Sequence, residues 1–258
     1  MKVKLTEQQF RRVILKEDWP GMDIFDSGPV EELNIVQPRG EIEAFLVKAG
    51  KALGIIDVMV RGGFNRVKND IEKLVTEGKL NMDKPLKKLM IGTHGSPWDA
   101  GCGRFTFDVD DEDDAESYNF LRYLSQFLTK STKVFFTGCY SGTNPIFLSK
   151  MAKALGVEKV TASTGIYFPA LNKVLDGSFI TCKATSNNDI GSNEGEVETP
   201  MGWVKWTPEE KKHMGDILRR TQGKGTDEVK KYKEERLEEK LKTMGCTLSS
   251  SNPYGSWI

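Results

Sequence analysis

The stretch KVFFTGCYSG, residues 133–142, decides most of what can be predicted about the fold. Residues 133–137 combine apolar and β-branched side chains and predict a short buried strand. Glycines then flank Cys139, which indicates a tight turn where that strand ends. Asn144 and Pro145 follow as a helix cap and a first-turn proline. The stretch is therefore typical of a strand–turn–helix unit with a cysteine in its turn.

The same unit recurs along the chain on both sides of this stretch. Apolar runs predict further strands at 33–36, 55–60, 86–93 and 159–161. Segments with helical spacing separate these strands, at 42–53, 67–75, 120–128 and 146–155, and a hairpin is expected at 101–109. This alternation indicates an α/β domain with a mostly parallel sheet flanked by helices.

The regular alternation stops beyond residue 161. Residues 186–200 are rich in turn formers and predict a long exposed loop, and a short strand containing Trp203 and Trp206 follows. A capping box predicts a helix start at Thr207, and 227–244 predicts a solvated surface helix. We divide the chain into an N-terminal helical extension (1–30), an α/β domain (31–206) and a C-terminal helical extension packed on or beside it (207–258).

Composition excludes several classes of protein. The 258 residues carry 37 basic and 37 acidic side chains, so no global field favours nucleic acid or an anionic membrane. No apolar run approaches the roughly 18 residues of a spanning helix, and no secretory signal is evident at the N-terminus. We expect a cytoplasmic protein, with delivery by a specialised secretion route left open. The four cysteines form no CxxC pair, and in a reducing compartment they would be free thiols.

Two turns fall at the ends of neighbouring predicted strands. Strand 86–93 runs into His94 and Gly95, and strand 133–137 runs into Gly138 and Cys139. Because the carboxyl ends of parallel strands meet at one edge of a sheet, an imidazole and a thiol are expected there together. The second histidine, His213, lies among lysines within a predicted helix, which is typical of a surface residue.

The motifs THGSP and FFTGCYSG, with Cys139 45 positions after His94, resemble the caspase-haemoglobinase fold of clan CD cysteine peptidases. That group includes caspases, metacaspases, legumains, clostripain and gingipains, and the resemblance covers roughly residues 30–206. It implies a three-layer sandwich around a mostly parallel sheet. The caspase signature QACRG is absent, so the resemblance does not imply cleavage after aspartate.

The resemblance implies a hydrolase, a thiol protease that cleaves peptide bonds in peptides or proteins through an acyl-enzyme. Cys139 would be the nucleophile and His94 the acid/base, and the N–H groups of Gly95 and Cys139 would form the oxyanion hole. Ser163, Thr164 and Trp203 would bind substrate. Members of the group cleave after Arg/Lys, Asn, Asp or Leu, which leaves the preference open, and our own expectation is a basic side chain. If self-processing occurs, residues 186–200 are its expected site, and a passive surface loop is the other interpretation of this stretch. The alternative function is a catalytically inactive caspase-like interaction or regulatory module. Oligomeric state is left open.

No cofactor or metal is expected at the site itself. The acidic run 108–116 has two interpretations: a helix start favoured by the helix dipole, or a calcium site at Asp110, Asp111, Asp113 and Asp114, although EF-hand spacing is missing. The sequence excludes a cysteine phosphatase, because the position at which its phosphate-binding loop requires arginine is occupied by Pro145. The sequence has no glycine-rich phosphate-binding loop after its first strand, which argues against nucleotide binding.

Overall fold

The computed structural model describes residues 30–38, 44, 47–48, 50–51, 56–95, 99–102, 105–108, 115–168, 173–175, 178–184 and 206–250. Several predictions fall outside these residues. They are the N-terminal extension up to residue 29, the loop 186–200, Trp203, and the four acids of the calcium hypothesis, Asp110, Asp111, Asp113 and Asp114.

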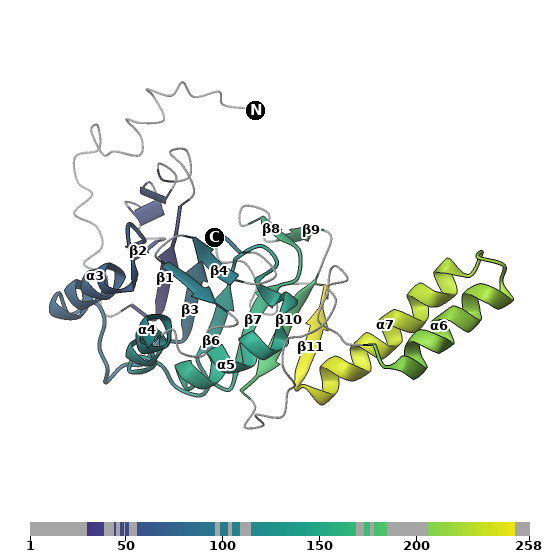
Figure 1. Ribbon diagram of the computed structural model, residues 1–258. Coiled ribbons are helices and arrows are strands. Elements are labelled where there is room, and N and C mark those ends of the chain that lie inside the picture. Colours follow the sequence, from purple (N-terminus) through teal and green to yellow (C-terminus); the bar gives the residue numbers. More distant parts are fainter. Residues whose placement is uncertain are drawn as a thin grey trace, which may run out of the picture.

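A seven-stranded sheet forms the centre of the molecule, in the order β11-β10-β7-β6-β3-β1-β2 (Figure 1). Five strands are parallel: β1 (Glu32–Val36), β2 (Val58–Met59), β3 (Lys88–Gly92), β6 (Lys133–Phe136) and β7 (Lys159–Ser163). Antiparallel pairing then joins β10 (Phe179–Lys183) to β7 and β11 (Cys246–Ser249) to β10. The predicted α/β class with a mostly parallel sheet is confirmed.

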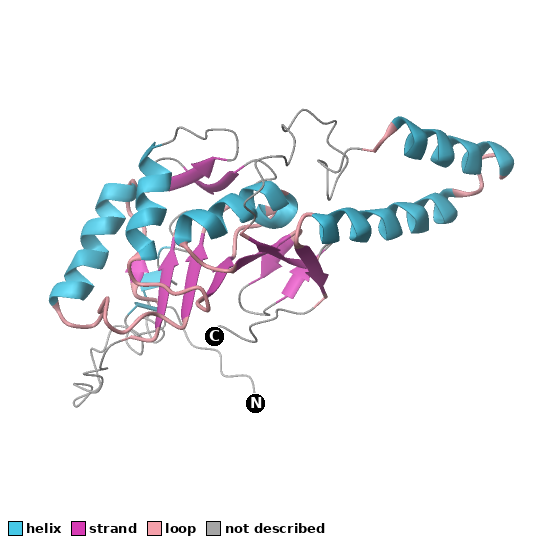
Figure 2. Ribbon diagram, turned by 90° about the horizontal axis from the view of Figure 1, so that it is seen from below, coloured by secondary structure: helices cyan, strands magenta, loops and turns pink. Residues whose placement is uncertain are grey.

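Three helices cover one face of this sheet: α3 (Phe64–Thr76), α4 (Ala115–Ser125) and α5 (Pro145–Leu155) (Figure 2). The connections β2→β3, β3→β6 and β6→β7 all cross the sheet in the same direction, so right-handed crossovers place their helices on one face. The connection from β1 to β2 crosses in the opposite direction. The structure describes only five helical residues in it, 44, 47, 48, 50 and 51.

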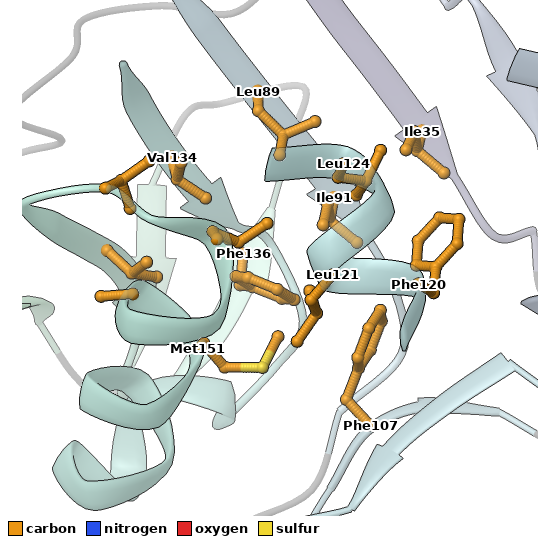
Figure 3. Packing of buried hydrophobic residues seen from close by; sticks show 14 of the residues in the cluster. Ile35, Leu89, Ile91, Phe107, Phe120, Leu121, Leu124, Val134, Phe136 and Met151 are labelled. Carbon is orange, nitrogen blue, oxygen red and sulfur yellow. The ribbon is translucent and has the colours of Figure 1, made fainter. Parts of the chain in front are cut away.

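Apolar side chains fill the space between sheet and helices. Phe136 of β6 faces α4 and α5, where Leu121 and Met151 meet it (Figure 3). A two-stranded hairpin, β4 (Asp99–Cys102) and β5 (Phe105–Asp108), closes one end of this core. Phe105 contributes a ring whose centroid lies 4.8 Å from that of Phe64 in α3. Burial of these rings contributes on the order of 2–3 kcal/mol each, which fixes the hairpin against the helices.

The predicted caps at the ends of two helices are present in the structure. Asn144 Oδ1 accepts a hydrogen bond of 3.0 Å from the N–H of Phe147, and Gly156 ends α5 with a φ of 68°. The capping box at Thr207 is complete, with its hydroxyl accepting from Glu210 N–H and the Glu210 carboxylate accepting in return. These helix starts and the end of α5 are confirmed.

The C-terminal region differs from a purely helical extension. Helices α6 (Pro208–Arg220) and α7 (Thr226–Thr243) form a hairpin that projects past the edge of the sheet (Figures 1 and 2). The chain then returns as β11 and becomes an edge strand of that sheet. Trp206 lies in no strand: Lys233 and Lys240 of α7 approach its ring at 5.9 and 5.6 Å. No helix in the described part of the chain is long and apolar enough to span a membrane.

Two of the cysteines are joined, contrary to the expectation of free thiols. Cys182 of β10 and Cys246 of β11 are directly opposite each other in the strand register and form a disulfide. They are 64 residues apart in sequence, so their proximity depends on β11 returning to the sheet. The bond fastens the end of the helical hairpin to the domain.

Reduction of this disulfide is expected to destabilise the protein by about 2–4 kcal/mol, because the bond restricts a long loop of the unfolded chain. Thermal unfolding followed with and without a phosphine reductant measures the loss. A variant with both Cys182→Ala and Cys246→Ala should show a low melting temperature that the reductant does not change. Equal melting temperatures of the wild-type protein in both conditions would contradict the pairing.

Candidate functional site

The predicted histidine and cysteine turns meet at the carboxyl edge of β3 and β6. His94 follows β3 by two positions, and Cys139 follows the adjacent β6 by three. A Cβ atom placed on Gly138 would lie 3.3 Å from the carbonyl oxygen of His94, and one placed on Gly95 would lie 2.4 Å from that of Cys139. The backbones of the two turns are therefore in direct contact, which confirms that the two turns lie together at one edge of the sheet.

The glycines of these turns serve close backbone packing and not a left-handed backbone conformation. None of Gly95, Gly138 and Gly142 has a positive φ, and the residue that does is Tyr140, at 58°. The glycines instead permit close packing of backbone on backbone. A Cβ atom on Gly142 would lie 2.9 Å from the carbonyl oxygen of Ser163 at the end of β7. Because glycine has no side chain, the neighbouring backbone segments can approach one another closely at these three positions.

The turn that carries Cys139 is held by a set of hydrogen bonds. The carbonyl oxygen of Gly138 accepts from Ser141 Oγ at 2.7 Å, from Ser163 Oγ at 2.8 Å and from Ser141 N–H at 3.3 Å. The N–H of Tyr140 donates to the carbonyl of Gly165 at 2.9 Å. These bonds stabilise the left-handed conformation of Tyr140, which is costly for a residue with a side chain.

The thiol and the imidazole are both half-buried. Among the cysteines whose side chains the structure describes, Cys139 is the one outside a disulfide. The Nε2 atom of His94 is shielded from solvent. A partly exposed thiol and an imidazole on two turns whose backbones are in contact have the components of a nucleophile and its proton carrier.

Of the residues expected to bind substrate, two prove to be internal. The Ser163 side chain is fully buried, and its hydroxyl lies within hydrogen-bonding distance of the carbonyls of Gly138 and Gly165. Thr164 is also buried and bonds twice to the backbone of Ser178, which closes the loop around the strands β8 (Ile166–Phe168) and β9 (Lys173–Leu175). Direct substrate contact by Ser163 and Thr164 side chains stays a prediction.

The sequence interpretation named Ser163 as a substrate contact and did not name Ser141, so it missed the supporting role of both serines. Nothing in the sequence pattern separates Ser141 and Ser163 from ordinary turn and strand serines, because their common acceptor, the Gly138 carbonyl, is a backbone atom. The interpretation of His213 fits its surroundings better: it lies exposed on α6, with its ring 4.6 Å from that of Tyr232 in α7.

Metal-binding groups are not found in the described part of the chain, where no three His, Cys, Asp or Glu side chains gather. The acidic run leads into α4, which begins at Ala115 and has Glu116 in its first turn. The Glu116 carboxylate accepts a hydrogen bond of 3.2 Å from the side chain of Asn65 in α3. A helix start after the acidic run is thus confirmed.

Comparison of the chain with protein-family models, with curated proteins and with solved structures gave no match.

Proposed function

We propose that this protein is a cysteine endopeptidase of the clan CD type. The observation that carries the proposal is the backbone contact between His94-Gly95 and Gly138-Cys139 at the carboxyl edge of two adjacent parallel strands. Open parallel sheets bind their ligands at this edge, beyond the ends of the strands. The mostly parallel sheet and the half-buried Cys139 thiol support the same conclusion.

The reaction begins when Cys139 Sγ attacks the carbonyl carbon of a peptide bond and forms a carbon–sulfur bond. The carbonyl oxygen becomes an oxyanion that accepts hydrogen bonds from the N–H groups of Gly95 and Cys139. The thiol proton passes to His94, which gives a proton to the leaving amine as the carbon–nitrogen bond breaks. Water then hydrolyses the thioester and releases the acid. Self-processing would be the same reaction with residues 186–200 as substrate.

An electrophilic peptide probe tests this function. We expect the probe to label the wild-type protein and the Cys102→Ala variant equally, and to leave Cys139→Ala unlabelled. Cys182 and Cys246 lie in the disulfide and should not react. Tryptic mapping of the labelled protein identifies the modified peptide.

Two outcomes would count against the proposal. Label that remains on the Cys139→Ala variant would remove the assigned nucleophile. A wild-type protein that takes up no probe and cleaves no member of a positional peptide library would favour the alternative, an inactive caspase-like interaction module.

A further inference from the structure

The carbonyl of Gly138 and the N–H of Cys139 belong to one peptide unit. A trans peptide is planar, so its C=O and N–H bonds point in opposite directions and cannot be turned independently. The hydrogen bonds that hold the Gly138 oxygen consequently also fix the direction of the Cys139 N–H. This N–H is one of the two donors assigned above to the oxyanion hole.

Two buried hydroxyls hold that oxygen. Ser141 Oγ reaches it from within the turn at 2.7 Å, and Ser163 Oγ reaches it from the end of β7 at 2.8 Å. The side chains are 3% and 0% exposed, so bulk water does not compete for the acceptor. Ser163 is the last residue of β7, an interior strand between β6 and β10, and it pairs with Phe179 of β10, so a strand and not a loop anchors it.

We propose that Ser163, together with Ser141, is a positioning residue that aims the Cys139 N–H at the developing oxyanion. This inference rests on the proposed function. It assigns Ser163 to the support of the turn that carries the nucleophile, and not to direct contact with substrate. Hydrogen bonds to a carbonyl also polarise its peptide unit, which makes the N–H of that unit a stronger donor. The two serines therefore act on both the direction and the strength of one donor.

Loss of this positioning should affect some reactions of the Cys139 thiol and not others. Acyl transfer to Cys139 passes through a tetrahedral oxyanion and needs the donor. Alkylation of the same thiol by iodoacetamide displaces iodide and forms no oxyanion. Loss of the Ser163 hydroxyl should therefore slow acylation and spare alkylation, whereas general disorder of the turn would change both rates.

The experiment compares these two rates at Cys139 in a Cys102→Ala background. p-Nitrophenyl acetate acylates the thiol: Sγ bonds to the acetyl carbon, p-nitrophenolate leaves, and the thiol proton goes to His94 or water. We expect Ser163→Ala to lower the ratio of acylation to alkylation roughly ten- to a hundredfold, a fraction of the loss seen when such a donor is removed. Rates measured on Cys139→Ala are subtracted as background.

Thr161→Val is the matched control. Thr161 lies on the same strand, is fully buried and hydrogen-bonds through its hydroxyl to Thr181 at 2.8 Å, away from the turn. Its ratio should equal that of the wild-type protein. Ser141→Ala provides a second variant on the same acceptor and should lower the ratio in the same direction if Ser163→Ala fails to fold.

The outcomes separate this inference from the proposed function. A folded Ser163→Ala protein with an unchanged ratio, or with both rates reduced alike, would overturn the positioning role. A reduced ratio in a protein whose wild type cleaves no peptide would sustain the positioning role and reject the peptidase. Where peptides are cleaved, Ser163→Ala should lower kcat and leave KM nearly unchanged, because the donor acts in the transition state.

Discussion

Peptide turnover is expected to fall by about 10²–10⁴-fold when His94 is replaced by alanine, because the leaving amine then has no positioned proton donor. The melting temperature should change little, since His94 is a half-buried residue at a strand end and outside the apolar core. Both quantities are measured on the same preparation, turnover with a cleaved peptide from the library and stability by thermal unfolding.

His213→Ala serves as the control for this variant. His213 is exposed on α6, in the hairpin that projects past the sheet, and its loss should leave turnover unchanged. A His94→Ala protein that keeps its activity while losing several degrees of melting temperature would show that the imidazole has a structural role. The proposed proton transfer would then have to be assigned to another group.

Gly95→Ala is expected to have the second large effect. The added Cβ atom would lie 2.4 Å from the carbonyl oxygen of Cys139, which is a backbone atom and cannot turn away as a side chain does. The two turns would have to move apart. A displacement of about 1 Å at a reacting group costs on the order of 10²-fold in rate, and the strain should lower stability by about 1–3 kcal/mol.

Gly215→Ala is the matched glycine control for this change. Gly215 lies within α6, and a Cβ atom there would have no neighbour within 4 Å. Alanine favours a helix over glycine by about 1 kcal/mol, so this variant should be slightly more stable and fully active. Gly95→Ala with wild-type kcat/KM would contradict the close contact between the two turns.

Local patterns in the sequence determined the helices, most strands of the sheet and the place where the turns that carry His94 and Cys139 meet. The apolar period distinguishes strand from helix within a few residues, and caps such as Asn144 and Thr207 act on N–H groups of the adjacent turn. Parallel strands linked by helices leave their carboxyl ends at one edge, so the candidate site followed from the order of the elements alone.

Tertiary structure alone decided the features that depend on segments far apart in the chain. Cys182 meets Cys246 only because β11 returns to the sheet after the helical hairpin, a pairing without a local signal. The hydroxyl of Ser163 and the carbonyl of Gly138 are separated by 25 positions, and the three-residue 3₁₀ turn η1 (Ser141–Thr143) and all of α5 lie between them. Strand register and close backbone packing bring these distant groups together. A sequence pattern predicts neither the register nor the packing, because both depend on how whole strands align with one another.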